Sequence, residues 1–105
     1  MAIHESGHVL AALAQVGIDT GVRRPFNFYL HFPSQSAATA VGRELSESGF
    51  RCRIRQSSGG RWLCLVGALL IPDDSALETV LHLMETMAED FGGAFDGWET
   101  PVTTH

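Results

Sequence analysis

Apolar and polar residues alternate most regularly at residues 26–32, which read F-N-F-Y-L-H-F. Because successive side chains of a strand point to opposite faces, the phenylalanines and the leucine fall on one face and Asn27, Tyr29 and His31 on the other. The pattern therefore predicts a half-buried strand, which ends at Pro33.

Residues 50–56 alternate in the same way. Their apolar side chains share one face, and the opposite face carries Arg51, Arg53 and Arg55. The Ser-Ser-Gly-Gly turn at 57–60 and the apolar run at 61–71 then predict a β-hairpin. If the hairpin loop has an even number of residues, cross-strand parity places Leu63 and Leu65 on the buried face and Trp62 and Cys64 beside the arginines.

Helical spacing of apolar residues separates these strands. Residues 2–16 are compatible with a first helix, and Ser34 can cap a second helix that ends at Gly49. A third helix begins near the Ser75–Glu78 capping box and carries an apolar stripe to Phe91. Residues 94–98 follow as a short fourth strand or an extended segment.

After the first helix the predicted order is β-α-β-β-α-β. This order is typical of the ferredoxin-like fold, an α/β (α+β) arrangement in which two helices cover one face of an antiparallel sheet and the first and third strands are central. We expect a single domain over residues 1–105, with an N-terminal helix at 1–17, a ferredoxin-like core at 26–98 and a tail at 99–105. The fold hosts many unrelated functions and does not define one by itself.

Charge is distributed unevenly along the 105 residues, whose net charge is -5. Seven arginines and four acids give residues 1–61 a charge of +3, whereas residues 62–105 carry eight acids, no basic residue and a charge of -8. The sequence therefore predicts a bipolar domain with a basic sheet face, although the overall charge opposes nucleic-acid binding.

Other sequence features narrow the class of protein. The longest uncharged apolar run is too short to span a bilayer, and the first eight residues do not resemble a secretory or transit peptide, so we expect a cytoplasmic protein. Cys52 and Cys64 are too far apart in sequence for a C-x-x-C motif. We interpret them as two small apolar side chains, with a cross-strand disulfide as the alternative.

The segment His4-Glu5-Ser6-Gly7-His8 fits the H-E-x-x-H pattern, in which two histidines bind zinc and the glutamate acts as general base. A zinc-dependent hydrolase that uses this segment is therefore one alternative function. On a helix, however, His4 and His8 point away from the apolar stripe and towards solvent, and no third ligand is singled out by its spacing. We expect no catalytic residues, no bound metal and no cofactor.

The open face of the predicted sheet is the candidate interaction surface. Its candidate partner-binding residues are Tyr29, His31, Arg51, Arg53, Arg55 and Trp62. Arginines beside aromatic side chains are typical of protein interfaces, but the same composition also suits an RNA-binding module or a solvated strand face. Asp96, Gly97 and Trp98 are interpreted as a structural motif, in which Gly97 permits a tight turn, Asp96 bonds the turn backbone and Trp98 is buried.

Several landmarks resemble the family called Regulator of ribonuclease E activity B. They are Arg24-Pro25 leading into residues 26–33, the Val-Gly-Arg-Glu-Leu run at 41–45, Gly49-Phe50, Ile71-Pro72-Asp73, and residues 95–100. The resemblance covers about residues 9–102. It implies a non-enzymatic ferredoxin-like domain that binds the scaffold region of ribonuclease E and damps RNA decay, so the expected partner is a protein of RNA decay.

Overall fold

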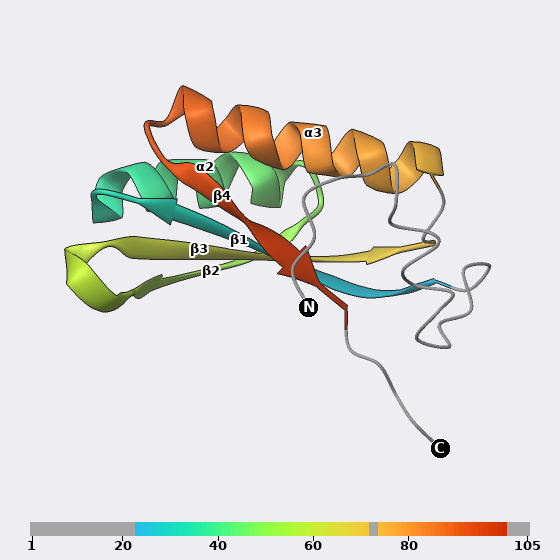
Figure 1. The fold of residues 1–105 in the computed structure, drawn as a ribbon, viewed down its shortest axis with the longest axis horizontal. Coiled ribbons are helices and arrows are strands. Elements are labelled where there is room, and N and C mark those ends of the chain that lie inside the picture. The colour runs from blue at the N-terminus through green and yellow to red at the C-terminus, as the bar shows by residue number, and fades with distance from the viewer. Residues whose placement is uncertain (1–22, 72–73, 101–105) are drawn as a thin grey trace, which may run out of the picture.

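The computed structural model describes residues 23–71 and 74–100 (Figure 1). The elements in chain order are β1 (Arg24–Phe32), α2 (Gln35–Glu47), β2 (Arg51–Gln56), the short 3-10 turn η2 (Ser58–Gly60), β3 (Trp62–Leu70), α3 (Asp74–Asp90) and β4 (Ala94–Glu99). A four-stranded antiparallel sheet with two helices confirms the predicted α+β class. The predicted first helix, with the H-E-x-x-H segment, lies outside the described residues.

The strands lie in the order β2-β3-β1-β4, so β3 and β1 are central. Both helices cover the same face of the sheet: α2 packs mainly on β2 and β3, and α3 packs mainly on β4 and β1 (Figure 1). No described helix or strand lies on the opposite face, which we call the open face. Of the helices in the described ranges, none combines the length and the apolar character needed to cross a membrane.

The core lies between the helices and the sheet. It is built from the inward positions of the alternating strands and the apolar stripes of the helices. The buried members are Phe26, Phe28, Leu30, Phe32, Ala38, Val41, Leu45, Cys64, Val66, Leu77, Leu81, Met84, Ala88 and Trp98. The Ser34 Oγ accepts a hydrogen bond from the Ala37 N–H at 3.2 Å, which caps α2 as the sequence predicts.

A β-bulge interrupts β4 next to β1. Phe28 lies opposite Trp98 and Leu30 opposite Phe95, so three residue steps on β4 match two on β1. Gly97 has a φ of 108°, a conformation that glycine adopts without steric cost. In a regular strand, residues three apart face opposite sides, so the bulge is what allows both Phe95 and Trp98 to pack on the core. Gly97 thus lies in a strand and not in the tight turn that the sequence suggested.

The β2–β3 hairpin differs from the expectation based on an even loop. Five residues, 57–61, separate the two strands, and the Ser57 N–H bonds the Arg61 carbonyl oxygen at 2.7 Å. The odd loop pairs Arg55 with Leu63 and Arg53 with Leu65, so these leucines lie on the open face.

The expectation for Trp62 and Cys64 is wrong for the same reason. Trp62 packs against the core cluster and Cys64 is fully buried. Trp62 lies opposite Phe32, and the residue opposite Tyr29 is Leu65, so Tyr29 and Trp62 are not neighbours.

Candidate interaction surface

Cross-strand pairing arranges the open face in rows that run from β2 across β3 to β1. The three rows are Arg55-Leu63-His31, Arg53-Leu65-Tyr29 and Arg51-Gly67-Asn27. Each row therefore has an arginine on β2, a leucine or glycine on β3, and a polar or aromatic side chain on β1. Five of the six candidate residues lie on this face, and Trp62 does not.

The arginine row of β2 (Arg51, Arg53 and Arg55) is exposed along its whole length. Within residues 23–71 and 74–100 no carboxylate forms an ion pair with any of the three guanidinium groups. Alternate residues of a strand are about 7 Å apart, so the three charges repel one another weakly. Their positive potential is not neutralised by an ion pair with any described carboxylate.

A leucine stripe on β3 (Leu63, Leu65 and Leu69) runs beside the arginine row. Leu63 and Leu65 are half-buried, and Leu69 is 61% exposed. A partly exposed apolar line bordered by cations has the composition of a protein interface, where apolar contact supplies affinity and charge supplies orientation. The sequence did not predict this stripe, because an even hairpin loop would place Leu63 and Leu65 on the buried face. The number of residues in the loop is the sequence feature that distinguishes the two arrangements.

The far edge of the open face is acidic. The Tyr29 hydroxyl donates a hydrogen bond to the Glu99 carboxylate, and His31 Nδ1 contacts the Asp96 carboxylate. On its other side, His31 Nε2 lies 3.5 Å from the Ser57 Oγ of the hairpin loop. Asp96 therefore binds the β1 histidine and not its own backbone, and these contacts fix the orientation of both ring side chains.

Burial raises the pKa of Tyr29 to about 12, and the hydrogen bond and negative charge of Glu99 act in the same direction. The positive charge of Arg55 opposes this shift. The charge of the open face thus changes from basic at β2 to acidic at β4.

The structure also brings Trp98 of the Asp-Gly-Trp motif into the core. Trp98 is 1% exposed, and its ring centroid lies 5.3 Å from that of Phe26. The flanking Asp96 and Glu99 reach the open face. One short segment thus combines a core anchor with the acidic edge of the candidate surface.

Sequence comparison with protein families assigns the chain. Residues 3–100, nearly the whole chain, match the family described as Regulator of ribonuclease activity B. The chain belongs to this family. The match begins nearer the N-terminus than the resemblance over 9–102 indicates, so it includes the segment from His4 to His8. Among individually curated proteins, none matches the chain.

Membership of the Regulator of ribonuclease activity B family associates the chain with the regulation of RNA decay. In the part of the chain that the structure describes, no three side chains of histidine, cysteine, aspartate or glutamate gather in a way that could hold a metal ion. His4 and His8 lie outside that part.

The two cysteines of this family member meet on the helix-covered face of the hairpin. Both are free thiols, Cys52 half-buried and Cys64 buried. Interaction between the two thiols lowers the pKa of Cys52 and, together with burial, raises the pKa of Cys64. The predicted alternative of a disulfide is not what the structure contains.

Proposed function

We propose that the chain is a non-enzymatic regulator that binds the scaffold region of ribonuclease E through its open face and thereby damps RNA decay. The observation that carries this proposal is the exposed arginine row, without ion pairs among the described residues, beside the leucine stripe. Together with family membership, this surface favours a protein partner of RNA decay. The strand order also supports assignment to the ferredoxin-like fold. A partner of RNA decay would place the protein in the cytoplasm.

Direct RNA binding through the same face is less well supported. RNA-recognition domains of this general shape stack bases on aromatic residues of the central strands. The corresponding outward positions of β3 are Leu63 and Leu65. Tyr29, on the outward face of β1, is already bonded to Glu99, and the acidic edge would repel phosphate.

The experiment compares binding and RNA cleavage with purified ribonuclease E and a form that lacks the scaffold region. The wild-type chain is expected to bind only the full-length enzyme and to slow cleavage of a structured RNA. The triple variant Arg51→Ser, Arg53→Ser, Arg55→Ser should lose at least ~100-fold in affinity, because it removes a row of interface cations that lacks internal partners.

A charge-matched control is Arg23→Ser, Arg43→Ser, Arg61→Ser, whose arginines lie before β1, on α2 and in the hairpin loop. This control should bind as the wild type does. Equal affinity of wild type and the β2 triple variant would remove the open face from the proposal. Binding that disappears after nuclease treatment would instead indicate an RNA bridge.

A further inference from the structure

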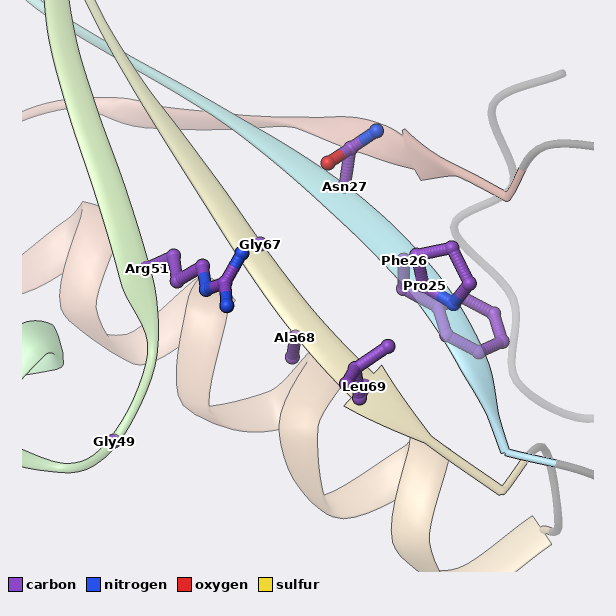
Figure 2. A pocket seen from close by; sticks show the side chains of 8 residues that line it. All are labelled: Pro25, Phe26, Asn27, Gly49, Arg51, Gly67, Ala68 and Leu69. Atoms are coloured by element: carbon purple, nitrogen blue, oxygen red, sulfur yellow. The ribbon is translucent and has the colours of Figure 1, made fainter.

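A shallow hollow opens on the face where β3 carries no side chain (Figure 2). Gly67 forms its floor, Arg51 and Asn27 flank it, and Leu69 and Pro25 lie at one end. Its volume is about 360 Å³, and a second hollow of about 260 Å³ shares Asn27, Arg51 and Gly67 and extends to Arg53. The two hollows therefore form one depression between the arginine row and β1.

Packing does not require a glycine at the floor of this depression. A Cβ atom on Gly67 would meet Asn27 Oδ1 at 3.7 Å and Arg51 Cβ at 3.8 Å, which are ordinary contact distances. Its φ is not positive either. Glycine weakens the interior of a strand and often marks a site where another group approaches the backbone. Gly67 leaves an open space between positions of the sheet face that carry side chains.

The walls of the hollow are matched to a flat ring. The Arg51 side chain reaches from β2 towards Gly67 on β3, and Leu69 stands exposed at the end of the same strand (Figure 2). A guanidinium group stacks well on an aromatic face, and Leu69 offers apolar contact to the ring. The Asn27 amide on the other side supplies hydrogen bonds to a polar ring substituent or to a backbone group.

We propose that this hollow receives one aromatic side chain of an extended, acidic segment of the protein partner, whose carboxylates pair with Arg53 and Arg55. This inference rests on the proposed function and names the chemistry of the partner segment. The arginine row supplies the charge complementarity, since no described carboxylate satisfies it.

The size of the hollow favours a single side chain over a free metabolite. Pockets that bind small molecules typically measure about 300–1,000 Å³ and bury most of the ligand. The part of the depression over Gly67, about 360 Å³, is at the lower end of that range. The depression is open along the sheet surface, so it would cover only one side of a ring. The acidic edge formed by Asp96 and Glu99 disfavours a nucleic-acid strand that crosses the face.

The test uses a fluorescent peptide of about 12 residues made of glutamate, aspartate and serine with one central tryptophan, and a second peptide in which alanine replaces the tryptophan. Fluorescence anisotropy at low salt measures both affinities. The tryptophan peptide is expected to bind the wild-type chain, and both the alanine peptide and the variant Gly67→Val should weaken binding by about tenfold.

A matched control is Ala94→Val, which creates the same side chain at an exposed strand position on the other edge of the sheet. It should leave the affinity unchanged. Thermal unfolding checks that Gly67→Val folds. If it does not, Gly67→Ala replaces it with a smaller expected loss, because its Cβ finds room.

Three results would overturn the inference. They are no binding of the tryptophan peptide to wild type, equal binding to wild type and Gly67→Val, and tighter binding of an oligouridylate of similar length that the same variant abolishes. Parallel measurements with ribonuclease E separate the two proposals. If Gly67→Val binds the enzyme normally while the β2 triple variant does not, only the hollow is refuted. If the peptide results hold but wild type does not bind the enzyme, only the partner assignment is refuted.

Discussion

Replacing Trp98 by alanine or by phenylalanine separates the two contributions of its indole ring to stability. Trp98 is 1% exposed and packs against Phe26, so Trp98→Ala removes a large buried ring. Such truncations cost about 3–5 kcal/mol, a large part of the ~5–15 kcal/mol by which a domain is stable. At about 4–8 °C per kcal/mol, the melting temperature should fall by roughly 12–40 °C.

Trp98→Phe should be far milder. The indole Nε1 is buried without a hydrogen-bond partner, and an unsatisfied buried donor costs about 1–3 kcal/mol. Phenylalanine removes that donor and keeps an aromatic ring beside Phe26, although the smaller ring leaves some empty volume. The two effects oppose each other, so we expect a net loss of about 0–1.5 kcal/mol.

Urea unfolding followed by far-ultraviolet circular dichroism measures the free energy of unfolding of both variants. Binding to ribonuclease E provides a second readout. Trp98→Phe should retain binding, because Asp96 and Glu99 stay in place beside it. If Trp98→Phe loses as much stability as Trp98→Ala, the indole N–H has a partner in the folded protein. A loss below about 1 kcal/mol for Trp98→Ala would refute the placement of Trp98 in the core.

Two further predictions concern titration. Tyr29 is the single tyrosine of the chain and its pKa is raised to about 12, so its ultraviolet absorbance should remain that of the neutral phenol well above pH 10. Because the pKa of Tyr29 is higher in the folded than in the unfolded chain, Tyr29 stabilises the fold below pH 10, and this contribution is lost as the pH rises towards 12. Glu99→Gln should lower the pKa of Tyr29. An unchanged titration of Tyr29 in that variant would contradict its hydrogen bond to Glu99. Because the Cys64 thiol lowers the pKa of Cys52, iodoacetamide near neutral pH should modify Cys52 first, and Cys64→Ala should slow this reaction. Peptide mass spectrometry identifies the labelled residue, and faster labelling of Cys64 would contradict the assignment.

Much of the fold could be predicted because it depends on local patterns. Alternation in β1 and β2 separated core positions from surface positions correctly, since each strand has a period of two whatever its neighbours are. The cap at Ser34 and the long apolar stripe of α3 located both described helices. Family membership was also accessible, because its landmarks are short runs of residues along the chain.

The pairing register between neighbouring strands could not be predicted from local patterns. One residue more in the β2–β3 loop exchanges the two faces of β3, and this moved Trp62 inward and Leu63 outward. The bulge at Gly97 is a similar case, because it becomes visible only when β4 is paired with β1.

The sequence by itself determined the described elements, the polarity of the two faces of β1 and of β2, and the family, because these depend on residues close together in the chain. The tertiary structure decided which faces of neighbouring strands lie on the same side of the sheet. The Tyr29–Glu99 contact joins residues 70 positions apart and the His31–Asp96 contact joins residues 65 positions apart. The leucine stripe beside the arginines and the hollow over Gly67 depend on register in the same way. Register is set by loop length and by packing of the whole sheet on its helices, so the candidate surface exists only in the folded chain.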